Sequence, residues 1–384
     1  MNNRARITLV SFLAYFVMSG LLAPIGIVSG PMAEALNLTV VEVTSGFTWL
    51  TFGILAGAIL ALFVFEWLPL KTLLLLLFAG IGGTLAFLSR QSEAALIWYS
   101  LGLVGLCTGI ALAAAALTIT RTYDADRRAS MLVITDSWFS VAGVITSWVA
   151  IYLLGKSFHW SGSYLFIALI AVTVFGLVLG SKFPDASPPQ EERGVRTPWP
   201  LNVWLCVAAL FLYTLGQNSM LWWLPNYVQT HLAVAPDQAG SLVGQYWIGM
   251  FVAQLFVAWW VLKVGTKRVI GIGAITVTAF SIPLWTVSDP DALFVLATVW
   301  GFANLGMLKM VLSFATYMVP TPTPKLVSSL LLGASLGTAV SPWVTSQIVA
   351  ATSNHFILQF STLCYVGLSV LVFTAISRSK KIAL

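Results

Sequence analysis

Charged residues are scarce in this chain of 384 residues, because Asp, Glu, Lys and Arg together make up only 8% of it. Soluble globular proteins carry about 25% charged residues, so the scarcity excludes an ordinary soluble domain. Apolar residues make up 59% of the chain. They recur in runs of about 20, which is the length that a helix needs to cross a hydrocarbon core of about 30 Å. The composition predicts a polytopic membrane protein whose surface contacts the lipid bilayer.

Cysteine and histidine are also rare, with three residues of each. Cys107, Cys206 and Cys364 lie singly inside apolar runs, so they offer neither a disulfide framework nor the spacing of metal ligands. The histidines lie at or beyond the ends of the runs, and the sequence contains neither an HExxH motif nor a P-loop. We therefore predict no enzymatic activity, no metal site and no cofactor.

Twelve apolar runs predict an all-α fold of twelve transmembrane helices. Their approximate bounds are 8–30, 44–65, 71–89, 95–119, 131–154, 162–181, 200–225, 240–262, 269–287, 292–317, 326–350 and 356–377. All but three of the 19 basic residues then fall on the side of the two termini, since only Arg90 and Lys156 lie in opposite loops and Lys309 lies inside a span. The positive-inside rule predicts cytoplasmic termini in the cell inner membrane. This spread over short loops also argues against nucleic acid as a partner.

The longest polar segment, KFPDASPPQEERGVRTPWP (182–200), reads as a solvated linker. It predicts an N-terminal six-helix bundle over 1–181, a cytoplasmic linker over 182–199 and a C-terminal six-helix bundle over 200–384. The two halves match at a shift of about 196 residues, with Leu36 paired with Leu232, Ser45 with Ser241 and Gly53 with Gly249. Such a repeat indicates a duplicated unit. We expect the chain to act as a monomer.

Two loops carry a degenerate form of a motif found in the major facilitator superfamily. In the first copy Glu66 and Lys71 fill an acidic and a basic position, while Pro69 replaces a glycine. The second copy has Leu262 in the acidic position and keeps Lys263, Gly265, Lys267 and Arg268.

Four further stretches are distinctive, namely PLKT (69–72), TDSWFSVAG (135–143), SLVGQYW (241–247) and PTPKLV (322–327). Together they resemble the TsgA-type transporters, a branch related to fucose–proton symporters. The resemblance implies the major facilitator fold and alternating-access transport of a small solute. It also implies a central cavity lined by spans 1, 4, 7 and 10. The membrane carboxylates that the fucose symporters carry in spans one and four are absent from this sequence.

Lys309 is the one basic residue inside a span, within NLGMLKMVLSF (304–314). A charge at such depth costs on the order of 3 kcal/mol, so we expect its side chain to face water, an acid or a substrate. Phe302, Gly306, Lys309 and Ser313 share one face of a continuous helix. We interpret Lys309 as an anchor for a carboxylate. A snorkelling lysine or a gate residue near the cytoplasmic mouth is the alternative.

Asp136 is the other charge inside a span, about one and a half turns from the predicted start of span five. A carboxylate in a dry cavity could bind and release a coupling proton. Alternatively, Asp136 lies in the favourable field of its own helix N-terminus, pairs with a loop arginine, or forms a bridge with Lys309. As proton-coupling or gating residues we name Asp136, Glu66, Lys71, Arg127 and Arg128.

Span seven contributes amides and aromatic rings in YTLGQNSMLWW (213–223), a combination that suits a polar solute. Interhelical packing by the same side chains is the alternative. Our candidate substrate-binding residues are Lys309, Tyr213, Gln217, Asn218, Trp222, Asn304 and Tyr15.

These features predict a secondary active transporter of a small polar, carboxylate-bearing solute, with proton coupling left open. Two alternatives remain at this point. One is a proton-coupled transporter of a neutral, sugar-like solute. The other is a structural membrane protein that transports nothing.

Overall fold

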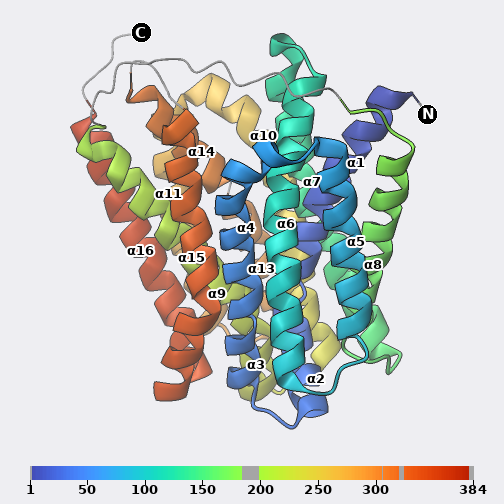
Figure 1. The fold of residues 1–384 in the computed structure, drawn as a ribbon. Coiled ribbons are helices and arrows are strands. Elements are labelled where there is room, and N and C mark those ends of the chain that lie inside the picture. Colours follow the sequence, from blue (N-terminus) through green and yellow to red (C-terminus); the bar gives the residue numbers. More distant parts are fainter. Residues whose placement is uncertain (1, 184–198, 305, 320–323, 380–384) are drawn as a thin grey trace. The chain divides into compact units, whose positions relative to one another are not determined.

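The computed structural model describes residues 2–183, 199–304, 306–319 and 324–379, and these fold into helices (Figure 1). Within the described residues, twelve helical segments are long and apolar enough to cross a membrane. The prediction of an all-α protein with twelve spans is therefore confirmed. The predicted linker lies almost wholly outside the described residues, as does part of the stretch 322–327.

The chain divides into two compact units, which we describe separately. Unit 1 comprises Met1–Pro189 together with Pro236–Gly244, and unit 2 comprises Gln190–Ala235 together with Gln245–Leu384. The helices of unit 1 are α1 (Asn3–Leu22), α2 (Ile25–Leu36), α3 (Val40–Gly46), α4 (Thr48–Trp67), α5 (Leu70–Leu88), α6 (Ala94–Thr122), α7 (Ala125–Gly155) and α8 (Gly162–Leu179).

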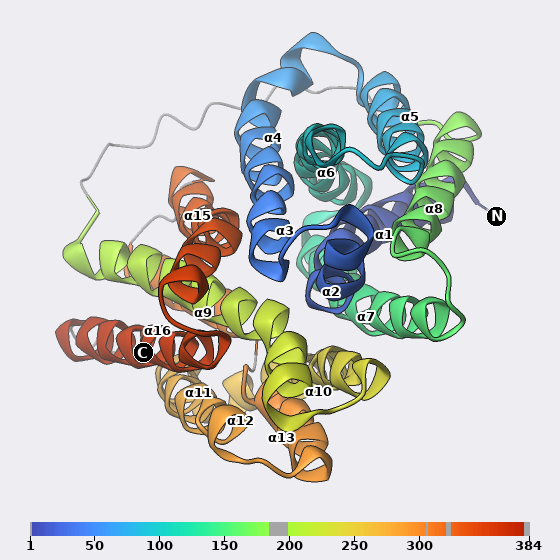
Figure 2. The ribbon, with the colours of Figure 1, turned by 90° about the horizontal axis from the view of Figure 1, so that it is seen from below.

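Helix α6 lies at the centre of unit 1, where it packs against α4, α5 and α1 (Figure 2). Glycines bring α4 and α6 into backbone contact. A Cβ added at Gly53 would lie 2.3 Å from the Gly102 carbonyl oxygen, and one at Gly105 would lie 2.2 Å from that of Leu50. Both distances are shorter than any side-chain carbon tolerates, so only glycine permits this close approach of the two helices.

Unit 2 is built around α9, which packs most extensively against α16 and α15. Its helices are α9 (Leu201–Leu232), the part of α10 (Pro236–Val264) from Gln245 onward, α11 (Thr266–Ser281), α12 (Pro283–Thr286), α13 (Pro290–Ala303), α14 (Met307–Tyr317), α15 (Pro324–Ala351) and α16 (Asn354–Arg378).

The glycine contacts of unit 1 recur in unit 2 at residues that are each 196 positions later. A Cβ added at Gly249 would lie 2.0 Å from the Thr298 carbonyl oxygen, and one at Gly301 would lie 2.1 Å from that of Tyr246. The pair α10 and α13 therefore repeats the pair α4 and α6, residue for residue. This confirms the internal repeat and supplies a structural register for comparing the two units.

The first span differs from the prediction because its helix is interrupted. We expected one run over 8–30, whereas α1 ends at Leu22 and α2 begins at Ile25. Pro24 stands at the break and supplies no backbone N–H, so the helical hydrogen-bond ladder cannot pass through it unchanged. The amide of Ala23 still donates to the Ser19 carbonyl, at 2.8 Å, and closes the end of α1.

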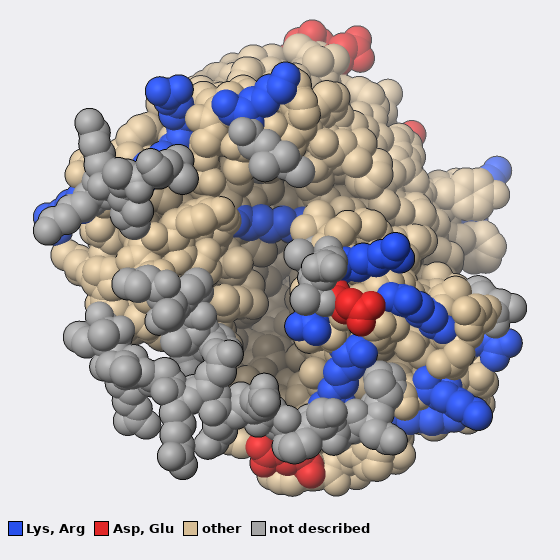
Figure 3. Space-filling view, turned by 90° about the horizontal axis from the view of Figure 1, so that it is seen from above, with Lys and Arg blue, Asp and Glu red and all other residues tan. Residues whose placement is uncertain are grey.

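Basic side chains gather at the end of unit 1 where the chain begins. They are Arg4, Arg6, Lys71, Arg121 and Lys182, and they are linked by shared contacts and shared hollows. Figure 3 views the face of the molecule on which Lys and Arg side chains are abundant and acidic side chains are few. We call this set of five residues the basic end of unit 1.

Candidate functional site

Gln217 lies at the centre of a buried polar cluster in unit 2. It stands midway along α9, where its Nε2 donates to the Tyr246 hydroxyl on α10 and lies 3.9 Å from the Met250 sulfur. The Tyr246 ring packs at 4.4 Å from the Trp300 ring on α13, between ring centroids. Trp300 in turn meets Tyr365 on α16 edge to face at 6.4 Å. Four helices therefore supply one connected group of amide and aromatic side chains.

Several polar atoms of this cluster are buried without a completed hydrogen bond. Among the described residues, no partner satisfies the hydroxyls of Tyr213 and Tyr365, the indole nitrogen of Trp300 or the side-chain oxygen of Asn304. The polar atoms of Tyr213 and Tyr246 are neighbours, and so are those of Tyr365 and Trp300. Neither pair has the geometry of a hydrogen bond. A buried polar group without a partner costs about 1–3 kcal/mol. The cluster is thus suited to receive water or the polar groups of a solute.

The internal repeat shows that the fold does not require these polar side chains. At positions 196 residues earlier, Gln217, Tyr246 and Trp300 correspond to Leu21, Leu50 and Val104. Those three residues are fully buried in unit 1. The same shift of 196 residues relates α1 to α9, because it pairs Gly20 with Gly216. A Cβ added at Gly20 would meet α8, and one added at Gly216 would meet α16. Unit 2 therefore carries polar groups where an equivalent scaffold packs with aliphatic residues.

The helix that carries Lys309 is broken, contrary to our expectation of one continuous span with a shared face. Helix α13 ends at Ala303 and α14 begins at Met307, with Gly306 in the left-handed region at φ 60°. Glycine adopts this conformation without strain, which permits the break. Phe302 and Lys309 belong to different helices, so the predicted common face is wrong.

Lys309 consequently lies in the first turn of α14. Its backbone N–H donates to the Gly306 carbonyl at 2.9 Å, and the residue is half-buried. A helix N-terminus carries partial positive charge, which favours anions and disfavours cations. Here the ammonium group adds to that field instead of opposing it. The Lys309 ammonium group and the N-terminus of α14 therefore both carry positive charge within a membrane span.

Of the remaining span-seven candidates, Tyr213 and Trp222 are buried, whereas Asn218 is half-buried and has a packing partner. Its amide donates to the Thr338 hydroxyl on α15 at 3.1 Å. Trp222 is 3% exposed. Asn304 at the end of α13 uses its amide to donate to the Trp300 carbonyl at 2.8 Å, which leaves its side-chain oxygen for another group.

In unit 1, Asp136 on α7 acts electrostatically on Tyr15 of α1, and both side chains are half-buried. The two helices pack together through a stacked pair, Phe12 and Trp138, with ring centroids 5.3 Å apart. Helix α7 begins at Ala125, so Asp136 lies 11 residues into the helix. The helix-terminus field falls off within the first turn, and the suggestion that this field stabilises Asp136 is therefore wrong.

Arg127 and Arg128 stand in the first turn of α7 and are exposed. Arg128 Nε lies 3.4 Å from the Tyr123 carbonyl oxygen, to which it donates. Along the helix axis Arg128 is eight residues from Asp136, which corresponds to about 12 Å. The structure therefore does not bring Arg128 and Asp136 together.

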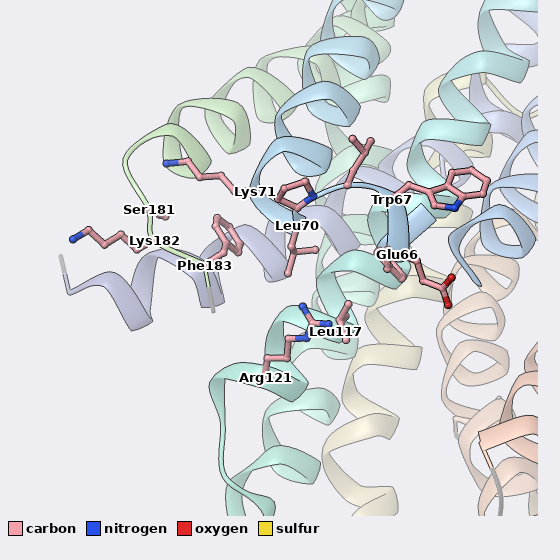
Figure 4. Close-up of a pocket in the computed structure, with 12 residues that line it drawn as sticks. Glu66, Trp67, Leu70, Lys71, Leu117, Arg121, Ser181, Lys182 and Phe183 are labelled. Carbon is pink, nitrogen blue, oxygen red and sulfur yellow. The ribbon is translucent and has the colours of Figure 1, made fainter. Parts of the chain in front are cut away.

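Glu66 and Lys71 flank a hollow of about 580 Å³ at the basic end of unit 1 (Figure 4). Lys71 donates to the Leu179 carbonyl at the end of α8, at 2.9 Å, whereas Glu66 is exposed. Arg121 of α6 and Lys182 complete the charged lining. In Figure 4 the Glu66 carboxylate points away from Arg121.

The substrate-binding residues named from the sequence include Gln217 and Tyr213 but not Tyr246, Trp300 or Tyr365. Aromatic residues are common in membrane spans, so their presence alone carries no signal. The available signal was the register of the repeat. Applying the 196-residue shift residue by residue reveals that Tyr246 and Trp300 replace aliphatic side chains.

Comparisons with known proteins agree with this architecture. The profile of the Major Facilitator Superfamily matches residues 7–234 and 205–382. A TsgA homolog of Citrobacter koseri is 31% identical over 379 residues, covering 97% of this chain and 95% of the relative. A TsgA homolog of Yersinia pestis is 28% identical over 373 residues and covers 96% and 95%.

Solved structures share the fold at low sequence identity. A mutant of the nucleoside transporter NupG superposes with a TM-score of 0.77 at 13% identity, covering 97% of this chain and all of that one. A bacterial homolog of the human lysosomal transporter Spinster superposes with a TM-score of 0.74 at 16% identity, covering 99% and 98%. With its twelve spans and its duplicated scaffold, the chain belongs to the major facilitator superfamily of membrane transporters and, within it, to the TsgA homologs.

Proposed function

We propose that this secondary transporter moves a small polar solute that carries a carboxylate, and that unit 2 supplies the recognition. The observation that carries the proposal is that Gln217, Tyr246 and Trp300 are buried polar side chains at positions where unit 1 has the buried aliphatic residues Leu21, Leu50 and Val104. Packing alone gives no reason for this difference between two equivalent scaffolds. Recognition of a polar ligand gives one, because a few convergent polar groups in an apolar wall fix a solute's orientation.

The carboxylate preference rests on Lys309 and the broken helix that carries it. The ammonium group lies in the first turn of α14, so it and the helix N-terminus present positive charge together. Discontinuous helices that aim their N-termini at anionic groups are a recurring device in transporters. A solute carboxylate beside Lys309 would lower the cost of a charge within a span. Tyr213, Asn218 and Trp222 on α9 and Asn304 at the end of α13 complete the proposed binding set.

Proton coupling is assigned to Asp136, with Tyr15 as its neighbour. Asp136 is half-buried within α7 and acts electrostatically on Tyr15. A carboxylate can bind a proton in a dry environment and release it in a wet one. Glu66, Lys71, Arg127 and Arg128 lie at the ends of their helices, where they are suited to gating.

We assign the basic end of unit 1 to the cytoplasm, with the transporter in the inner membrane. The assignment follows from the excess of Lys and Arg in the loops on the side of both termini. The two units correspond in this proposal to the two six-helix halves that alternate access.

A neutral solute is the second candidate, and one observation favours it. The cluster around Gln217 contains no charged residue and presents three large aromatic rings, Tyr246, Trp300 and Tyr365. Such a wall suits a ring-bearing or sugar-like solute through stacking and hydrogen bonds. NupG, which shares the fold, is described as a nucleoside transporter.

The deciding experiment is uptake by the purified protein in proteoliposomes, with a panel of organic acids, nucleosides and neutral sugars. The Lys309→Gln variant is expected to lose uptake of the carboxylate, while Lys309→Arg retains part of it. Lys267→Gln serves as the matched control, because Lys267 is exposed at the start of α11. Unchanged KM and kcat in Lys309→Gln would refute the anchor. Selective uptake of neutral solutes would favour the second candidate, and no flux of any solute under any gradient would contradict transport itself.

A further inference from the structure

The hollow at the basic end of unit 1 carries an excess of positive charge, and the transport proposal gives a role to Lys71 but none to Arg121 or Lys182. Its lining includes Lys71, Arg121 and Lys182 but only one acid, Glu66. The volume of about 580 Å³ is large enough for a phosphate and its substituents. Figure 4 shows that these side chains come from the α4–α5 turn, from α6 and from the segment after α8.

The wall of this hollow is fixed by side chains that bind the C-terminal end of α8. Arg6 donates to the Gly180 carbonyl and Lys71 to the Leu179 carbonyl, each at 2.9 Å. Asn3 and Lys182 exchange two further hydrogen bonds, each 2.8 Å long, through the Lys182 backbone. The helix dipole also stabilises cations that lie at a helix C-terminus. The position of Lys182 is therefore set before any ligand arrives.

Arg121 and Lys182 keep their charged groups available. Within the part of the chain that the structure describes, neither side chain has a hydrogen-bond or ion-pair partner. Arg121 is half-buried and Lys182 is exposed. The guanidinium group can bind two oxygens of a phosphate at once, and the ammonium group adds a point charge.

A second hollow of about 340 Å³ continues the same basic surface. It shares Arg121, Lys182 and Phe183 with the first hollow and adds Asn3 and Arg4. The Arg4 guanidinium lies over the Tyr123 ring, 4.2 Å from its centroid, which holds it in place. The two hollows together form a continuous positive surface.

Apolar side chains border the first hollow on α4. Trp67, which lines it, is 67% exposed, and Leu62 and Phe63 on the same helix are 63% and 53% exposed. On a membrane-spanning helix, large exposed apolar residues are suited to contact acyl chains. A ligand that bridges this boundary must combine an anionic head with an apolar tail, as a phospholipid does.

We propose that the hollow binds the headgroup phosphate of an anionic phospholipid, with Arg121 as its principal ligand and Lys182 as a second positive charge on the lining. Basic pockets between transmembrane helices at the membrane surface are suited to such headgroups. The lipid would tie the α4–α5 turn to the ends of α6 and α8 and so stabilise unit 1. The proposal is independent of the transported solute.

The test measures the thermal unfolding midpoint of the purified full-length protein in nanodiscs, with phosphatidylglycerol replacing phosphatidylcholine stepwise. We expect a saturating rise for the wild type and a rise at most half as large for the double variant Arg121→Gln/Lys182→Gln. The matched control is Arg90→Gln/Lys156→Gln, which removes two basic residues from the loops at the opposite ends of the helices and is expected to respond like the wild type.

Two further arms identify the source of the phosphate and guard against a folding defect. Soluble glycerol phosphate and inorganic phosphate in phosphatidylcholine nanodiscs are expected to give no comparable rise, and a full rise with either would overturn the lipid assignment. Arg121→Lys keeps the charge but loses the two-point contact, so it is expected to respond in between. Equal rises in the wild type and in the double variant would also overturn the proposal.

Discussion

The Gly301 backbone lies against the carbonyl oxygen of Tyr246 so closely that a Cβ on Gly301 would stand 2.1 Å from it. The contact sets the spacing of α13 and α10. Because the Tyr246 hydroxyl accepts a hydrogen bond from the Gln217 amide, the same backbone contact also helps to set where that hydroxyl lies. In unit 1 the equivalent contact, Gly105 against Leu50, holds α6 and α4 together without any polar group. The close approach of α10 and α13 and the proposed site around Gln217 therefore depend on the same stretch of backbone.

Substitution of Gly301 by alanine is expected to destabilise the protein, because the neighbour it meets is backbone and cannot move aside. Overpacking of this kind costs about 1–3 kcal/mol, which corresponds to a fall of several degrees in the unfolding midpoint. Gly105→Ala is expected to behave alike, since it meets the Leu50 backbone at 2.2 Å. Gly83→Ala is the control, as no atom lies within 4 Å of its added Cβ. Equal midpoints for all three variants would contradict the tight packing.

Gln217→Leu is expected to fold normally and to lose transport. The variant places in unit 2 the residue that unit 1 has at the equivalent position, Leu21, which is fully buried there. Purified yield and unfolding midpoint should therefore match the wild type, while uptake in proteoliposomes falls to background. Leu215→Ala, on the same helix and buried, provides a comparison in which stability falls but solute specificity is retained. Wild-type uptake by Gln217→Leu would remove Gln217 from the binding set.

The sequence predicted the twelve spans and the repeat because both are properties of composition and spacing. Hydropathy identifies spans without any knowledge of tertiary contacts, and Gly53 with Gly249 already indicated the register. Lys309, Gln217 and Tyr213 could be named because polar residues are unusual at that depth. These predictions depended only on the type of each residue and its depth in a span, and they required no knowledge of its tertiary contacts.

The breaks within spans were missed for a physical reason. Apolar composition does not distinguish a continuous helix from two helices joined by a left-handed glycine, as at Gly306, or interrupted near Pro24. A glycine or proline inside a span is tolerated when neighbouring groups satisfy the freed backbone. Only the three-dimensional structure reveals that. The same holds for Arg121 and Lys182, whose shared hollow brings together residues from distant parts of the chain.

Tyr246→Phe is expected to weaken solute binding without destabilising the fold. The change removes only the hydroxyl to which Gln217 donates, so the amide loses the contact that orients it. A hydrogen bond of this kind contributes about 0.5–1.5 kcal/mol, so KM should rise by about 2- to 10-fold. Tyr99→Phe is the control, because Tyr99 is 61% exposed. If Gln217 only packs between helices, KM stays unchanged, which is the result that would contradict its role.

Asp136→Asn is expected to abolish accumulation driven by an imposed pH gradient while leaving solute exchange at equilibrium. The amide keeps the shape of the carboxyl group beside Tyr15 but cannot exchange a proton at any working pH. Counterflow of labelled solute, which needs no net proton movement, separates coupling from binding. The control is Asp124→Asn, since Asp124 is exposed at the start of α7 and its side chain caps no helix amide. Proton-driven accumulation that persists in Asp136→Asn would assign coupling to another group, and loss of counterflow as well would make Asp136 part of the binding or gating machinery.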